Sequence, residues 1–384
     1  MPYNIGIDAR RLFEPRIGRY VQNLVRSLAG IDEDNIYSLF VGERYDGEFD
    51  DLPANFVRVV ERSQVHSFRE RLALSWSHLR QGLDLYHATH YVLPLWAPRR
   101  TVTTVHDIVH LLYPEFMPGR LAMFVAPAQI RGTLARSDRI IAESQNTKTD
   151  LVDYFDVRES KVTRIYPGVE ASFDPEPRPG DEEARRRLGI EGPYVLFRGD
   201  ERRHKNEERV LRAFAAARRS GNDGVGLVGF GDRELSVERF AHLTRALEIA
   251  NRVRWLDAAE DLAPALLRGA KLFLYPTLYE GFPAPVVEAM ACGVPVITSD
   301  NATIREIAEG SAKLIEPSSV ESLAGALSWC LNDDQLAADL VADGLERARG
   351  FRWQRVAEQT LEVYESALGS GERSRFLPRR RRPA

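Results

Sequence analysis

Short apolar segments recur along the chain and alternate with amphipathic ones. Most of the short segments are rich in β-branched residues and apolar on both faces, the pattern of parallel strands that helices cover on both sides. We expect strands at residues 4–8, 37–42, 85–89, 101–106, 139–143, 162–166, 194–199, 225–229, 272–276 and 294–298.

The stretches between these segments repeat apolar residues at helical spacing. One helix face follows the i, i+3, i+4, i+7 pattern, with Val21, Leu24, Val25 and Leu28. Another face lies near the C-terminus, with Val356, Thr360, Val363 and Tyr364. Regular alternation of strands and helices predicts the α/β class with parallel sheets.

The alternation is interrupted once, at residues 171–193, which are rich in proline, glycine and charge. We interpret this stretch as a linker between two α/β domains, at 1–170 and 194–352. A last helix is expected at 353–370, and packing back on the first domain is one option for it. Residues 371–384 include four consecutive arginines and show no periodicity, so we expect a disordered basic tail.

Composition narrows the classes of protein. Hydrophobic residues make up 44% of the chain and charged residues 28%, a balance typical of globular proteins. The net charge of −4 supplies no positive field for nucleic acid, so we expect no nucleic-acid partner. No apolar run reaches the roughly 18 residues of a membrane span. Two cysteines cannot staple a secreted scaffold, which favours a cytoplasmic protein.

The strongest chemical signal is the segment 275–300, which reads as strand, turn, helix and strand. Glu280 sits in the turn, and Glu288 lies eight residues later in the helix. Amides at 281–284 and the helix dipole would favour an anion there. A carboxylate beside an anion site needs another task, such as accepting hydrogen bonds from sugar hydroxyls. The alternative is a helix cap followed by a solvated glutamate.

A second signal is the basic loop RGDERRHKN, which directly follows the strand expected at 194–199. Lys205 is placed to reach a pyrophosphate from this loop. Arg198, Arg202 and Arg203 are candidates for a second phosphate contact, and the sequence does not choose between them. The alternative is an exposed basic loop without a ligand.

Two residues of the first half are further candidates. Gly18 opens the first helix, where the lack of a side chain lets the backbone approach a phosphate or sugar closely. His106 ends a strand, at the carboxyl edge where α/β proteins form their sites. The alternatives are a turn glycine and a structural histidine.

Two patterns resemble ligand motifs without their context. Gly224, Gly226 and Gly229 spell GxGxxG, but they fall within an expected strand, whereas a dinucleotide motif follows one. Asp32 and Asp34 spell DxD in a polar turn, where we expect no metal. No Cys/His cluster has zinc spacing.

The spacing Glu280-x7-Glu288 within EGFPAPVVEAMACGVPVITS resembles the signature of the retaining glycosyltransferases of family 4. Further text similar to this family lies at Ile17–Tyr20, Thr104–Asp107, Tyr166–Val169 and Lys205–Asn206. The resemblance implies the GT-B fold, in which two Rossmann-like domains face each other across a cleft with parallel sheets.

The resemblance also implies roles for site residues. Glu288 would bind the nucleotide ribose and His106 would lie beside the donor sugar as a catalytic residue together with Glu280. The donor sugar would be held by Glu280 and by the amides of Gly281, Phe282 and Pro283. Asp200 departs from the family, which usually has a phosphate-binding arginine at this position.

The implied reaction is hexose transfer from a nucleotide-diphosphate sugar, with retention of configuration and without a cofactor or metal. Front-face attack is preferred over a covalent intermediate on Glu280. The stretch HDIVHLLYPEFMP resembles bacterial mannosyltransferases of polysaccharide assembly, which favours GDP-mannose, with a UDP-sugar as the alternative. A glycan or polyprenyl-linked lipid would be the acceptor, and the basic tail could touch anionic lipid at the inner membrane face.

Rival functions stay open at this point. A phosphorylase or an epimerase shares the two-Rossmann architecture, although no sequence context here supports a pyridoxal-phosphate lysine. From another class, a non-catalytic subunit could bind a sugar nucleotide without turning it over.

Overall fold

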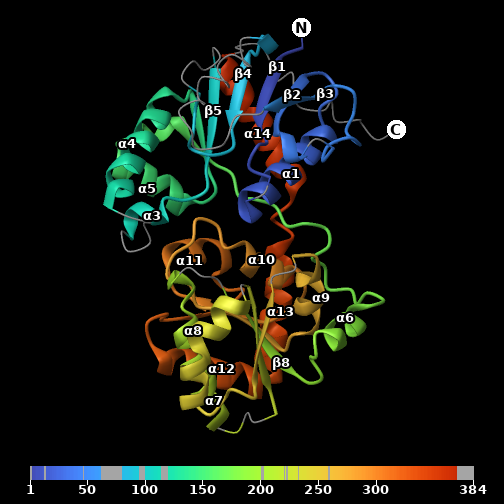
Figure 1. The fold of residues 1–384 in the computed structure, drawn as a ribbon, viewed down its shortest axis with the longest axis vertical. Coiled ribbons are helices and arrows are strands. Elements are labelled where there is room, and N and C mark those ends of the chain that lie inside the picture. Colours follow the sequence, from blue (N-terminus) through green and yellow to red (C-terminus); the bar gives the residue numbers. More distant parts are fainter. Residues whose placement is uncertain are drawn as a thin grey trace. The chain divides into compact units, whose positions relative to one another are not determined.

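A computed structural model describes residues 2–12, 14–45, 47–61, 80–94, 100–113, 120–199, 203–219, 221, 224–231, 233–257 and 260–369. The chain forms two compact domains (Figure 1). The first contains residues 1–168 together with 352–384, and the second contains residues 169–351.

The first domain is built on a parallel sheet that has seven strands within the described ranges. The strand order is β3-β2-β1-β4-β5-β6-β7. The strands are β1 (Asn4–Asp8), β2 (Ile36–Gly42), β3 (Phe56–Glu61), β4 (Leu85–Ala88), β5 (Arg100–Val105), β6 (Arg139–Ala142) and β7 (Val162–Arg164). The helices are α1 (Pro15–Ala29), α3 (Val109–Leu112), α4 (Arg120–Arg136), α5 (Gln145–Phe155) and α14 (Trp353–Leu368).

Two helices from opposite ends of the sequence share the main core of the first domain. The predicted face of α1 is fully buried there, with Val21, Leu24, Val25 and Leu28. The predicted face of α14 is buried as well, with Val356, Thr360, Val363 and Tyr364. Helix α14 therefore closes the first domain, although the chain reaches it only after completing the second.

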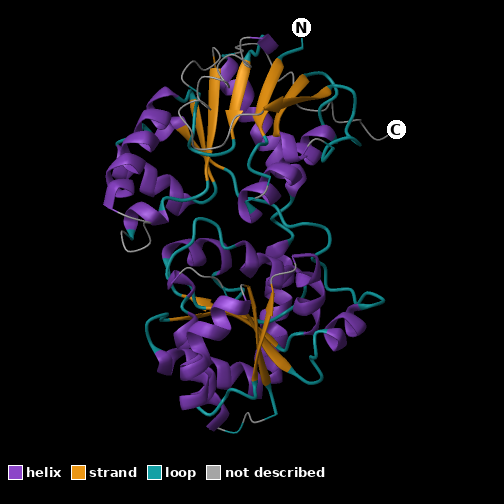
Figure 2. Cartoon of the chain, viewed as in Figure 1, coloured by secondary structure: helices purple, strands orange, loops and turns teal. Residues whose placement is uncertain are grey.

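The second domain repeats the architecture with a parallel sheet that shows six strands among the described residues. Their order is β10-β9-β8-β11-β12-β13. The strands are β8 (Tyr194–Arg198), β9 (Gly226–Gly231), β10 (Val253–Asp257), β11 (Leu272–Tyr275), β12 (Val296–Ser299) and β13 (Lys313–Ile315). The helices are α6 (Asp181–Arg187), α7 (Glu207–Arg219), α8 (Arg233–Ala246), α9 (Ala263–Gly269), α10 (Ala284–Ala291), α11 (Ala302–Ala308), α12 (Val320–Asn332) and α13 (Asp334–Ala348). Figure 2 shows helices flanking the strands of each sheet.

The stretch expected to be a linker is a packed part of the second domain. It contains α6, whose Asp181 is bound by Arg268 of α9 at 2.6 Å. Arg185 of the same helix donates to the carbonyl of Ala265 at 3.0 Å. Polar and charged residues suggested a flexible connection here, but they act as partners for α9. The division of the chain falls at Gly168 instead.

Three strands that the apolar pattern did not predict are edge strands. They are β3 at one edge of the first sheet, and β10 and β13 at the two edges of the second. Each of them has two or more residues that are partly or fully exposed. The strands predicted from segments that are apolar on both faces are interior strands, except β7 at the other edge of the first sheet. Edge strands are covered less completely, which weakens this pattern.

Both sheets reverse their strand order once, between β1 and β4 and between β8 and β11. At such a reversal, the loops that follow the two neighbouring strands run to opposite sides of the sheet. A crevice forms between them beyond the carboxyl ends of the strands, and α/β proteins bind ligands there. No helix of the described part of the chain is long and apolar enough to cross a membrane.

Candidate functional site

The reversal point of the second sheet carries a buried pair of opposite charges. Lys205 ends the short 3-10 turn Arg203–Lys205 after β8, and Glu280 lies between β11 and α10. The Lys205 Nζ is 2.6 Å from Glu280 Oε1, and the two side chains are only 6% and 5% exposed. The fold thus joins two of the predicted site residues that are 75 positions apart.

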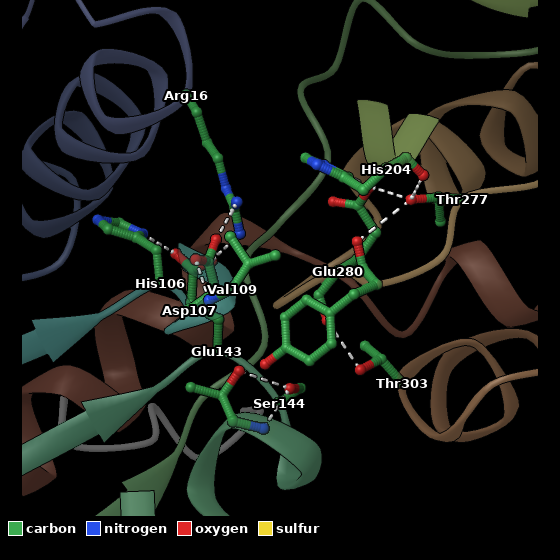
Figure 3. A network of polar contacts seen from close by, with 12 residues as sticks. Arg16, His106, Asp107, Val109, Glu143, Ser144, His204, Thr277, Glu280 and Thr303 are labelled. Atoms are coloured by element: carbon green, nitrogen blue, oxygen red, sulfur yellow. Dashed lines mark hydrogen bonds and ion pairs between the residues drawn. The ribbon is translucent and has the colours of Figure 1, made fainter. Parts of the chain in front are cut away.

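Glu280 is held by several donors of its own domain. Its Oε1 accepts hydrogen bonds from Tyr275 OH and Thr277 Oγ1, both at 2.8 Å, in addition to Lys205. Thr303 Oγ1 donates to the Glu280 carbonyl at 2.8 Å (Figure 3). Three donors on one carboxylate oxygen stabilise its charge and orient the side chain. This arrangement suits a binding group better than a covalent nucleophile, which needs an accessible oxygen.

The turn after Glu280 offers fewer amide donors than the sequence suggested. Pro283 has no N–H, so its predicted role as an amide donor to the sugar is wrong. The amide of Ala284 donates to Phe282 O at 3.0 Å and is used within the turn. The predicted set therefore reduces, at most, to the amides of Gly281 and Phe282. The Phe282 ring packs 5.7 Å from Phe351 within the same domain.

The other predicted residues of the second domain are placed as follows. Glu288 lies in α10 and is buried. Arg198 ends β8, and its guanidinium lies 5.2 Å from the centre of the Phe230 ring. Arg202, Asp200 and the Arg203 side chain lie outside the described residues. The ribose contact and the choice of phosphate-binding arginine stay predictions.

The first domain gathers a second polar cluster at the carboxyl edge of its sheet. His106 follows β5, and Glu143 follows β6. The His106 Nδ1 is 2.5 Å from Glu143 Oε1 (Figure 3), and its Nε2 is 2.9 Å from the carbonyl oxygen of Thr89, just after β4. Both ring nitrogens of the predicted catalytic histidine are thus bound within its own domain.

Arg16 extends this cluster from the first turn of α1. It contacts Asp107 Oδ2 at 2.6 Å and Glu143 Oε2 at 3.4 Å (Figure 3). Neither Arg16 nor Glu143 is among the predicted site residues. Glu143 could have been predicted from the sequence, because it is a charged residue at the carboxyl end of an apolar strand. No sequence pattern pointed to Arg16, because its partners Asp107 and Glu143 are 91 and 127 positions away.

A buried ion pair lies beside the reversal point of the first sheet, at the end of β1. Arg10 binds both carboxylate oxygens of Asp8, at 2.8 and 2.7 Å. Burial alone would raise the pKa of Asp8, but the charge and hydrogen bonds of Arg10 outweigh it and lower the pKa. The Thr89 hydroxyl donates to the Asp8 carbonyl at 2.6 Å, which fixes the segment that binds His106.

Gly18 is explained by packing inside the first domain. Helix α1 begins at Pro15, so Gly18 lies in its first turn and does not open it. A Cβ at this position would stand 2.3 Å from the carbonyl oxygen of Leu12. The Gly18 amide donates to Glu14 O at 2.7 Å. The close approach that requires glycine is to the protein's own backbone, and the predicted donor contact stays a prediction.

The two patterns set aside in the sequence are structural in the described chain. Asp32 accepts hydrogen bonds from the Asn35 side chain at 2.8 Å and from Tyr37 OH at 2.5 Å, so it organises a turn. Gly229 lies in β9, where a Cβ would stand 2.6 Å from Phe197. Among the described residues, no group of three His, Cys, Asp or Glu side chains could hold a metal ion.

Two parallel-sheet α/β domains, each with charged side chains at the carboxyl edge, define a protein of the two-Rossmann class. Two family models match the chain: "Glycosyltransferase Family 4" at residues 17–173 and "Glycosyl transferases group 1" at 180–347. The chain belongs to this glycosyltransferase family and is an enzyme of its group 1.

Curated relatives agree with this assignment. The O-antigen chain mannosyltransferase B of Escherichia coli is 26% identical over 373 residues, which cover 91% of this chain and 95% of the relative. A D-inositol 3-phosphate glycosyltransferase of Kineococcus radiotolerans is 30% identical over 324 residues, covering 76% of this chain and 73% of the relative.

A solved structure confirms the predicted GT-B fold. HepE of Anabaena, solved in complex with UDP and glucose, matches with a TM-score of 0.75 at 20% identity. The match covers 95% of this chain and all (100%) of HepE.

Proposed function

We propose that this glycosyltransferase moves a hexose from a nucleotide-diphosphate sugar to a glycan or polyprenyl-linked acceptor, with retention of configuration. The observation that carries the proposal is the buried Lys205–Glu280 pair at the reversal point of the second sheet. A cation and an acceptor-only carboxylate at one place suit a ligand that carries both phosphates and sugar hydroxyls.

The second domain would hold the donor. Lys205 would share its charge between Glu280 and the pyrophosphate, whose negative charge grows as the sugar leaves. Glu280, with the amides of Gly281 and Phe282, would orient the sugar, and Glu288 would bind the ribose. In this proposal, Lys205 stabilises the pyrophosphate charge, and no metal or cofactor takes part. Front-face attack, with the leaving phosphate taking the acceptor proton, is consistent with a Glu280 that is occupied by three donors.

His106 would act on the donor sugar as a catalytic residue. Its ring is held rigidly by Glu143 and by the Thr89 carbonyl. Such fixed polar groups stabilise charge without reorganising during the reaction.

The favoured donor is GDP-mannose. The relative named as an O-antigen chain mannosyltransferase aligns over 95% of its own length, which supports mannose. The alternative is a UDP-sugar, because HepE was solved with UDP and glucose. A glycan or polyprenyl-linked acceptor would place the reaction at the cytoplasmic face of a membrane. The arginines of 371–384, which lie outside the described residues, would contact anionic lipid there.

The decisive experiment screens nucleotide sugars by thermal shift and then measures nucleotide release from those that bind. We expect GDP-mannose to raise the melting temperature most and to release GDP in the presence of an acceptor glycan. Stabilisation by a UDP-sugar alone would overturn the mannose assignment. Binding of a donor without any nucleotide release, across a panel of acceptors, would favour the non-catalytic subunit.

A further inference from the structure

Two buried histidines of the first domain have opposite hydrogen-bond partners. His87 faces two hydroxyls: its Nδ1 is 2.7 Å from Tyr364 OH and its Nε2 is 2.8 Å from Thr104 Oγ1. A hydroxyl can donate or accept, so a neutral ring satisfies both contacts. Burial, and then the neighbouring His106, lower the pKa of His87 to about 3. His87 is therefore a neutral structural histidine.

His106 faces two groups that only accept. Its Nε2 lies 2.9 Å from the Thr89 carbonyl oxygen, and its Nδ1 lies 2.5 Å from a carboxylate oxygen of Glu143. A carbonyl and an ionised carboxylate have no hydrogen to give, so each ring nitrogen must carry one. A ring with hydrogens on both nitrogens is positively charged. When Glu143 is ionised, the two hydrogen-bond partners of His106 are therefore satisfied only by a positively charged ring.

The surroundings of Glu143 favour its ionised form. The Glu143 side chain is 3% exposed, and its second oxygen lies 3.4 Å from the Arg16 guanidinium. Arg16 is bound on its other side by Asp107, at 2.6 Å. The cluster alternates in charge, with Arg16 and His106 as cations and Asp107 and Glu143 as anions. A protonated Glu143 would lose its attraction to Arg16 and to the ring.

We propose that Glu143, braced by Arg16, is a positioning residue that holds His106 as a doubly protonated ring. His106 then supplies a fixed positive charge at the carboxyl edge of β5 and cannot serve as a general base. The use of this charge in catalysis rests on the proposed function, in which negative charge grows on the leaving diphosphate. The charge of the ring itself does not depend on that function.

Glu143→Gln is the informative variant, because it keeps the size and shape of the side chain. The amide can turn its NH2 toward Nδ1, which leaves the ring in place with one hydrogen, on Nε2. We expect kcat to fall at least about tenfold, while affinity for the free nucleotide diphosphate changes less than about twofold. Asp51→Asn is the matched control, since it removes an exposed carboxylate that pairs with Arg26. A Glu143→Gln enzyme with wild-type kcat would overturn the catalytic use of the charge.

The charge of the ring is read directly by nitrogen NMR of protein labelled in its histidines. The His106 signals are assigned by their loss in His106→Gln. We expect two protonated nitrogens in the wild type at neutral pH and one bare nitrogen in Glu143→Gln. A His106 ring nitrogen without a hydrogen in the wild type would refute the proposal, even if transferase activity were present. If the protein turned over no donor, the proposed function would be wrong. The nitrogen NMR signals would still show whether the His106 ring is charged.

Arg16→Met is a second variant, in case Glu143→Gln does not fold. The Arg16 side chain is 34% exposed, so its loss should be tolerated by the fold. Without the brace, the ring should share its hydrogen with Glu143, and a bare nitrogen should become detectable. Unchanged ring signals in this variant would show that Arg16 is not a brace.

Discussion

Replacing Lys205 by Met breaks the buried ion pair of the second domain and leaves the rest of the cluster in place. Met keeps most of the length of the side chain and removes only the charged group. Glu280 retains hydrogen bonds from Tyr275 and Thr277, both at 2.8 Å. The variant therefore isolates the effect of one missing cation beside a buried carboxylate.

The magnitude follows from burial. Lys205 and Glu280 are 6% and 5% exposed, so water cannot replace the lost partner. Removing one member of a buried ion pair costs about 3–5 kcal/mol, because the other charge stays buried and uncompensated. The two remaining donors place the expected loss near the lower end, at about 3 kcal/mol. For a domain of the size of residues 169–351, the melting temperature should fall by roughly 6–12 °C.

Chemical denaturation of the wild type and of Lys205→Met measures the free energy of unfolding of each protein. Arg212→Met is the control, since Arg212 and Glu208 form a 2.8 Å ion pair in α7 with side chains that are 45% and 57% exposed. An exposed helical pair contributes only about 0.3–0.5 kcal/mol. Loss of the buried ion pair should therefore lower the free energy of unfolding much more than loss of the exposed pair, although the two contacts are similar in length.

A second substitution tests the reason for the loss. Lys205→Met combined with Glu280→Gln should recover much of the stability, because the uncompensated charge is gone. The reasoning is refuted if Lys205→Met unfolds like the wild type, or if the double variant is as unstable as the sum of the two single changes.

Further predictions concern binding, catalysis, metals and the tail. Glu288→Ala should weaken free nucleotide and donor alike by about 1.5–3 kcal/mol, and unchanged calorimetric affinity would refute a ribose contact. His106→Ala should lower kcat by roughly a hundredfold with nucleotide affinity nearly unchanged, and it should also lower the melting temperature, because Glu143 stays buried without its ring partner. Near-wild-type kcat in the folded variant would exclude a catalytic role. Activity should survive EDTA, whereas loss that Mg²⁺ or Mn²⁺ restores would mean that a metal carries the pyrophosphate charge. Deleting 371–384 should leave turnover intact and weaken binding to anionic liposomes in a salt-dependent way, while aggregation would show that the tail is structural.

The interior of both domains follows from sequence pattern alone. Strands covered on both faces are rich in apolar and β-branched residues, so β1, β5, β8 and β11 are visible as short runs of such residues. Edge strands have one less neighbour and a weaker pattern, and three of the four (β3, β10 and β13) were recognised only in the assembled sheets. The stretch 171–193 looked like a linker because local composition does not show that α6 finds its partners on α9.

The candidate site residues of the second domain were also predicted from the chain. Lys205, Glu280 and Glu288 stand in local motifs, in which the residue types and their spacing along strand, turn and helix already indicate phosphate and sugar chemistry. Proline chemistry should have limited the amide set there as well, since Pro283 has no hydrogen to donate.

The tertiary structure alone decided which charged groups meet. Parallel strands place their carboxyl ends at one edge, so His106 and Glu143 come together from β5 and β6 although 37 positions separate them. Arg16 joins them from α1. A sequence pattern records which residues are buried, because burial depends on local periodicity. It does not record pairing across the sheet, because partners at the edge are chosen by strand order, and strand order is a property of the assembled fold.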